Sequence, residues 1–149
     1  MSVLVMLALG LPLACQQSSP PTGELLAFVS TNVDLPTQMD RIHVEVRSGD
    51  TAGDAGLYSA DYHLDPQARD HYALPATIGV VPSGDARRSV DIQVVGFLGH
   101  HAVLFQRMRT QVPRGRVALM PLPLNVDCLE DVAPSASGTY TSTRCADGQ

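Results

Sequence analysis

The feature that most constrains the fold is the segment RIHVEVR at residues 41–47, in which apolar and polar residues alternate one by one. Successive side chains of an extended strand point to opposite faces of a sheet. Ile42, Val44 and Val46 would therefore share one face, with polar residues on the other. A helix would instead need apolar residues three and four positions apart. The alternation predicts a β-strand with one face on a core and the other in water.

Six more segments combine strand-forming residues with flanking turn residues. They span residues 24–30, 57–64, 72–81, 89–98, 101–107 and 116–124. Pro75, Pro121 and Pro123 have no N–H to donate to a ladder, so we expect their strands at sheet edges or bulges. A single helical turn is expected at residues 65–70, and no segment has the apolar spacing of a long helix.

Short strands without long helices between them predict an all-β fold, a two-sheet antiparallel β-sandwich of about seven strands. It would be immunoglobulin-like or transthyretin-like. Antibody-type domains are disfavoured, because the chain has no Trp and no cysteine pair between its central strands. We expect the sandwich domain to occupy residues 25–127 and a cysteine-bearing C-terminal tail to occupy residues 128–149.

The N-terminal region carries an apolar run of a different kind, because residues 3–14 include no charged residue. These twelve residues are too few for a helix that spans a bilayer, which takes about 20. They match the length of the apolar region of a secretion signal, roughly 7 to 15 residues. We therefore expect residues 1–14 to be a signal peptide.

The apolar run ends in LPLAC, residues 11–15, which resembles the lipobox of bacterial lipoproteins, where a cysteine receives a diacylglycerol and becomes the new N-terminus. Ala14 is the small residue before Cys15, whereas Pro12 stands where the motif prefers Leu. The resemblance implies that Cys15 is lipidated and that residues 15–24 form a lipid-attached tether. Two or three acyl chains anchor a protein stably. An ordinary cleaved signal, or an N-terminal core strand with a buried cysteine, are the alternatives.

Cys128 and Cys145 remain as an even pair, and exported proteins favour disulfides. A bond between them would close a loop of about 18 residues and contribute roughly 3 kcal/mol through chain entropy. The alternative is a pair of free thiols in a redox or metal site, although the spacing is not C-x-x-C.

The order of these parts resembles that of uncharacterised cell-surface lipoproteins of Gram-negative bacteria. The matching parts are Cys15, DRIHVEV at 40–46, LPATIGVVP at 74–82, RMR at 107–109, Gly115 with Arg116, and the cysteine-bearing tail. The resemblance implies a single sandwich domain held in the cell envelope, at the periplasmic face or the cell surface. Tails of this kind continue to a further cysteine, so the partner of Cys128 stays open. The family supplies no established activity.

One set of residues has the composition of a metal site. Asp61, His63 and Asp65 follow each other at period two, which places them on one strand face. Side chains along a strand face stand parallel and do not converge on one point, so a solvated outer face is the simpler interpretation. His100 and His101 adjoin at a turn and would need ligands from elsewhere. We therefore predict no metal site and no cofactor.

Several functional classes are excluded or disfavoured by motif and composition. The chain has no nucleophile elbow, phosphate-binding glycine loop or zinc-protease motif, so we expect no enzyme. Its net charge is -5 and all ten basic residues are Arg, which argues against nucleic acid as a partner. Without Trp, and with seven Phe and Tyr expected mostly inside, aromatic sugar platforms are only weakly indicated.

The sequence thus predicts a lipid-anchored, non-catalytic module of the cell envelope, with a binding or structural role. Its contacts would be the membrane, through the N-terminal lipid, and an unknown protein or glycan that meets loops such as residues 48–56. The alternative is an exported metal-binding or enzymatic domain that uses surface Asp and His. Its candidate histidines are His43, His63, His71, His100 and His101.

Overall fold

Seven strands and one short helix make up the computed structural model, which describes residues 23–49, 56–81, 89–130, 132 and 140. The elements are β1 (Glu24–Thr31), β2 (Arg41–Ser48), β3 (Tyr58–His63), β4 (Ala76–Val80), β5 (Ser89–Leu98), β6 (His101–Gln111), β7 (Val117–Leu124) and the 3-10 helix η1 (Val126–Cys128). Each predicted strand segment overlaps one of these strands. The helical turn expected at residues 65–70 is wrong, because successive hydrogen-bonded turns occupy that segment.

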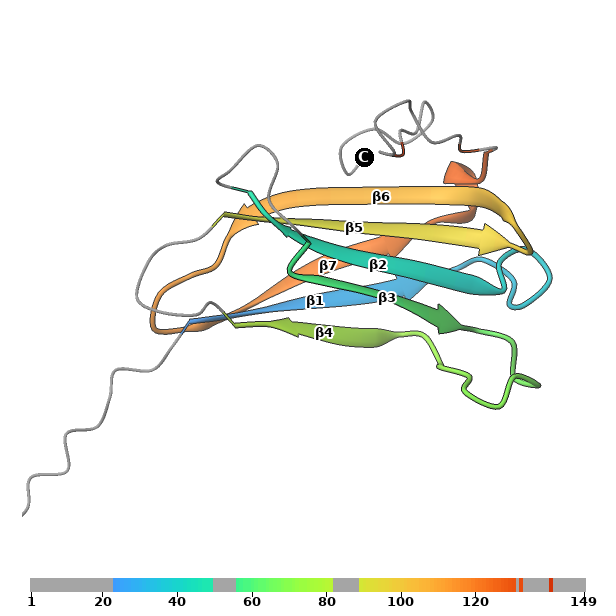
Figure 1. Cartoon of the computed structure of the whole chain (residues 1–149), viewed down its shortest axis with the longest axis horizontal. Coiled ribbons are helices and arrows are strands. Elements are labelled where there is room, and N and C mark those ends of the chain that lie inside the picture. Colours follow the sequence, from blue (N-terminus) through green and yellow to red (C-terminus); the bar gives the residue numbers. More distant parts are fainter. Residues whose placement is uncertain (1–22, 50–55, 82–88, 131, 133–139, 141–149) are drawn as a thin grey trace, which may run out of the picture.

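The strands form two sheets packed face to face, with the orders β4-β1-β7 and β3-β2-β5-β6 (Figure 1). Every pairing is antiparallel except that of β1 with β7. The predicted two-sheet sandwich is confirmed. Its strand order differs from that of immunoglobulin constant domains, in which the first, second, fifth and fourth strands share a sheet. Here β1 pairs with β4 and β7, and β2 pairs with β3 and β5.

The core lies between the inner faces of the two sheets. Burial alternates along β1 and β2 as the sequence pattern predicts, and the three apolar residues of β2 are all buried. β5 departs from this pattern, because eight consecutive residues of it are buried. Its outer face is covered by the C-terminal segment, where Val132 and Tyr140 pack on a cluster that includes Val95 and Phe105.

Both prolines of β7 and the proline before β4 mark sheet edges, as predicted. β4 and β7 are the outer strands of the three-stranded sheet. Pro121 and Pro123 are exposed on β7, and Pro75 directly precedes the first residue of β4. A residue without an N–H costs least on a strand that has a neighbour on one side only.

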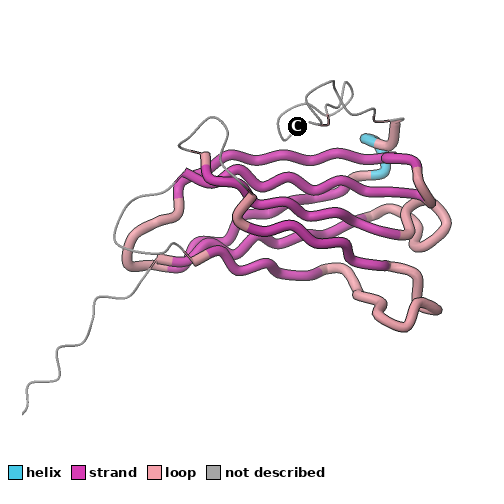
Figure 2. The backbone as a smooth tube through the Cα atoms, viewed as in Figure 1, coloured by secondary structure: helices cyan, strands magenta, loops and turns pink. Residues whose placement is uncertain are grey.

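The loops gather at the two ends of the sandwich (Figure 2). We call the end where β1 begins the proximal end. There the amide of Glu24 donates to the carbonyl of Arg116 (3.1 Å). A Cβ on Gly23 would lie 1.5 Å from the carbonyl oxygen of Pro113, so the chain enters β1 through a contact that admits only glycine. We call the opposite end, with the Gly99–His100 turn between β5 and β6, the distal end.

Candidate functional site

A cavity of about 470 Å³ lies at the distal end, on the outer side of the four-stranded sheet. It lies where β2 begins and β3 ends, next to the turn between β5 and β6. Its lining residues are Asp40, Arg41, Asp61, His63, Asp65, Ala68, Gly99 and His100. The fold thus brings the three predicted metal-type residues to one place and adds His100 from a segment distant in the sequence.

The carboxylate of Asp61 accepts hydrogen bonds from two side chains of β2, Arg41 and His43. Nη1 of Arg41 donates to its Oδ1 at 2.5 Å, and Nδ1 of His43 reaches the same oxygen at 3.2 Å. Burial alone would raise the pKa of Asp61, but the hydrogen bonds from Arg41 and His43 hold that pKa below its ordinary value. The Arg41 guanidinium also lies 4.1 Å from the ring centroid of Phe97, which fixes its position.

The other two carboxylates of the cavity stabilise loops. Asp40 accepts a hydrogen bond from the amide of Gly99 (2.7 Å), and Asp65 accepts one from the amide of Gln67 (2.8 Å). Asp65 lies beyond the end of β3, so it is not on the strand face that its spacing predicts. Within the described ranges, no group of three or more His, Cys, Asp or Glu side chains is placed to hold a metal ion. The cavity instead offers fixed acceptors and two imidazoles to a polar ligand.

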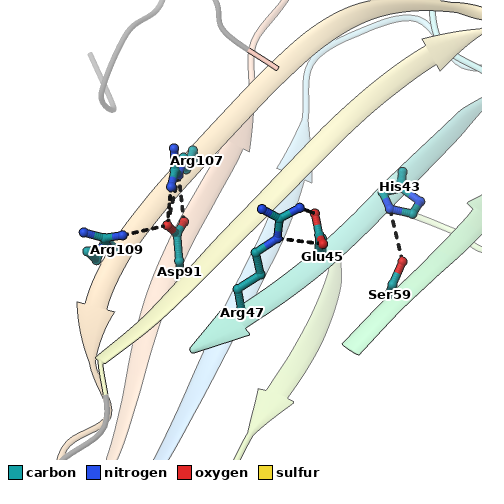
Figure 3. A network of polar contacts seen from close by, with 7 residues as sticks. All are labelled: His43, Glu45, Arg47, Ser59, Asp91, Arg107 and Arg109. Atoms are coloured by element: carbon teal, nitrogen blue, oxygen red, sulfur yellow. Dashed lines mark hydrogen bonds and ion pairs between the residues drawn. The ribbon is translucent and has the colours of Figure 1, made fainter. Parts of the chain in front are cut away.

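A second arrangement was not apparent from the sequence. Nε2 of His43 lies 3.3 Å from Oγ of Ser59, while its Nδ1 donates to Asp61 (Figure 3 shows the His43–Ser59 contact). This is the connectivity of a serine hydrolase triad. However, Arg41 binds the same oxygen of Asp61, and the cavity is lined by Asp61 but by neither Ser59 nor His43. We interpret the contacts of Ser59, His43 and Asp61 as cross-strand pairing on the solvated face of β2 and β3.

The proximal half of the same sheet carries a network of ion pairs (Figure 3). Asp91, only 5% exposed, accepts hydrogen bonds from Arg107 (Nε, 2.8 Å) and Arg109 (3.3 Å). The bonds from Arg107 hold the pKa of Asp91 below its ordinary value, although burial acts in the opposite direction. Arg47 binds Glu45 through two hydrogen bonds of 2.7 and 2.8 Å. The outer face of the four-stranded sheet is therefore polar and internally paired in this half.

Three tyrosines cluster at β3, the edge strand of the four-stranded sheet. The hydroxyls of Tyr58 and Tyr62 are hydrogen-bonded, and the rings of Tyr62 and Tyr72 pack edge to face with centroids 4.8 Å apart. Tyr58 is 42% exposed and Tyr72 is 52% exposed, so the expectation that the aromatic residues are mostly inside is wrong for both. An edge strand has a neighbour on one side only, which leaves its inward-facing rings partly uncovered.

Replacing Tyr58 by Phe should lower the pKa of Tyr62. The hydrogen bond from Tyr58, together with partial burial, raises the pKa of Tyr62 to about 12. Without the Tyr58 hydroxyl, Tyr62 should ionise nearer to the ordinary tyrosine value of about 10. A titration of tyrosinate absorbance in the ultraviolet measures this directly, because the chain has no Trp. Tyr140→Phe is the control, and identical alkaline midpoints for Tyr58→Phe and this control would contradict the assigned contact.

The predicted modification sites lie mostly outside the described residues. Cys15 and Cys145 belong to undescribed segments, so lipidation and the Cys128–Cys145 bond stay predictions. Cys128 itself is buried in η1. Of the loop at residues 48–56, positions 50–55 are likewise outside, but its flanks lie at the proximal end. The cavity, at the other end, is the candidate binding site that the described residues present.

No protein-family model matches the sequence, and a search of curated proteins finds no match. The solved structure of an alternative pilotin from the type II secretion system of Vibrio cholerae is similar to this chain, with a TM-score of 0.47 and 8% sequence identity. The likeness covers 70% of this chain and 96% of that chain. In the part of the chain that the structure describes, no helix is long and apolar enough to cross a membrane.

Proposed function

We propose that this protein is a lipid-anchored, non-catalytic binding module of the cell envelope, which presents its distal cavity to a protein or glycan. The observation that carries the proposal is the position of the two functional regions at opposite ends of one sandwich. The segment with the lipobox-like cysteine leads into β1 at the proximal end, and the polar cavity lies at the distal end.

The geometry of the proximal end supports an anchor. The eight residue steps from Cys15 to Gly23 can span at most about 29 Å when fully extended. This length allows the domain to reach the membrane surface without being drawn into it. The tight contact of Gly23 with Pro113 fixes the point from which the tether extends. A lipid at Cys15 would therefore hold the proximal end near the bilayer.

The chemistry of the distal cavity supports binding rather than catalysis. Its carboxylates already accept hydrogen bonds, from Arg41 for Asp61 and from backbone amides for Asp40 and Asp65. Such groups are held in place by their partners and can accept further bonds through their remaining lone pairs. A partner that brings N–H or O–H donors, such as a basic side chain or a sugar hydroxyl, fits this lining.

The anchor is tested by mass spectrometry of the protein extracted from membranes of an expressing bacterium. We expect a mature N-terminus at Cys15 whose mass includes a diacylglycerol and its acyl chains. Cys15→Ser should carry no acyl mass, since it has no thiol to modify. An unmodified N-terminus at any other residue of the wild-type protein would refute lipidation and leave an ordinary signal peptide as the alternative.

A further inference from the structure

The outer side of the three-stranded sheet is apolar, unlike the proximal half of the outer side of the four-stranded sheet. The register places Leu26 of β1 beside Leu119 of β7 and Gly79 of β4, so these positions share one side. We call this surface the apolar face. Its apolar members are Leu26, Phe28, Val81, Val117, Leu119, Pro121 and Pro123. Glu24, at the proximal limit, is the only charged residue of β1, β4 and β7.

The apolar face is open to solvent in the folded domain. Leu119 is 65% exposed, Val81 58% and Val117 57%, and these are the three largest exposed fractions among the bulky apolar residues of the described segments. Antiparallel sandwiches ordinarily carry polar residues on their outer faces. A contiguous apolar patch marks a surface that meets a partner or a membrane.

The position of the apolar face relative to the tether indicates that it meets a membrane and not a protein partner. Val117 lies opposite Glu24 in the register, and Val81 follows Val80, which lies opposite Leu25. The three most exposed side chains are therefore at the proximal end, within the reach of the tether. A bilayer that holds Cys15 is thus brought close to this face.

Two exposed arginines at the proximal end suit a phospholipid surface, whereas Glu24 on the apolar face opposes it. Arg114 and Arg116 are exposed in the loop between β6 and β7, directly before Val117. Arginine binds phosphate groups through paired N–H donors, and basic residues beside apolar ones are typical of proteins that lie at a membrane interface. The distal cavity is on the other sheet and at the other end, so contact through the apolar face would leave it open.

We infer that the apolar face is a membrane-docking surface, which rests on the bilayer that holds the lipid anchor. The inference builds on the anchor in the proposed function and adds an orientation: the three-stranded sheet toward the membrane and the polar four-stranded sheet away from it. Docking places the side chains of Val117 and Leu119 among the headgroups and upper acyl chains, and Arg114 and Arg116 beside the phosphates.

The absence of Trp from the chain gives a direct test, because one introduced Trp is then the only one present. The mature lipidated protein with Leu119→Trp would be reconstituted into phosphatidylethanolamine–phosphatidylglycerol vesicles, with or without brominated acyl chains that quench nearby Trp. We expect a blue-shifted emission and a loss of fluorescence in the brominated vesicles. Val117→Trp, on the same side of β7, should behave alike.

Leu98→Trp is the matched control, since Leu98 is also an exposed leucine but lies at the distal end of β5. Its emission should be the same in both kinds of vesicle. If the protein floats with vesicles while Leu119→Trp and Val117→Trp are no more quenched than Leu98→Trp, the docking surface is refuted and the anchor stands. Failure to float would refute the anchor itself. One further outcome would overturn the inference. If the Leu119→Trp variant forms a dimer without lipid, and its indole is shielded from both quencher and water, the apolar face meets a second copy of the protein.

Discussion

Replacing Leu122 by Ala is expected to lower the free energy of unfolding by about 2–5 kcal/mol, the range for a large buried aliphatic residue cut to Ala. Leu122 is fully buried (0% exposed) on the inner side of β7 and belongs to the main core cluster between the sheets. The loss combines the lost burial of the side chain with the cavity left in a close-packed interior. Urea unfolding followed by far-ultraviolet circular dichroism measures the change.

Leu119→Ala supplies the matched control, because the two leucines lie three residues apart on one strand and differ in the face they occupy. Leu119 points outward and loses little on truncation in water, so its effect should stay within about 0.5 kcal/mol. Similar losses for the two variants would show that the faces of β7 have been assigned wrongly. They would also remove the basis for the docking surface.

Replacing Asp91 by Asn should cost about 1.5–3 kcal/mol at neutral pH, the range for hydrogen bonds that involve a charged group. The Asp91 carboxylate is buried and accepts bonds from Arg107 and Arg109. The amide has only one acceptor oxygen and carries no charge. The side chain of Arg107 is 41% exposed, so solvent screening places the loss toward the lower end of the range.

The cost of this substitution should depend on pH. The pKa of Asp91 in the folded protein is held below its unfolded value of about 3.9, because Arg107 binds the charged form. The unfolded chain therefore binds more protons in acid, and the stabilisation is complete above about pH 5 and lost as pH falls through the folded pKa. The difference in stability between wild type and Asp91→Asn should narrow from about pH 5 to about pH 3. A constant difference over this interval would contradict the ion pair.

The fold was predictable because alternation and turn residues agree along most of the chain. The alternating segment at residues 41–47 became β2 with one more residue, Ser48. The errors lie at strand ends. The segment predicted at residues 72–81 shortens to β4, because Pro75 disfavours regular pairing before Ala76. β6 continues to Gln111, four residues beyond its predicted end, since it keeps pairing with β5 up to Ser89.

The site was predictable only in part, because it depends on which strands pair and in which register. Period two places Asp61 and His63 on one side of a strand, and this part is confirmed for β3. The sequence does not show that β2 lies next to β3 with Arg41 opposite His63, and this register brings Arg41 and His43 to Asp61. The sequence did indicate that both faces of β5 are covered, because Val94, Val95 and Phe97 place apolar residues on both faces of this strand.

The pairing of β1 with β7 has a consequence for how the chain acquires its structure. Thr31 and Leu124 are hydrogen-bonded although they are 93 residues apart in the sequence. Among the described strands β1 comes first in the sequence and β7 comes last, so one side of β1, the central strand of this sheet, stays unpaired until β7 is available. Contacts of such long range slow folding, and an unpaired strand attracts foreign strands. A chaperone that shields β1 during this interval would raise the yield of native protein.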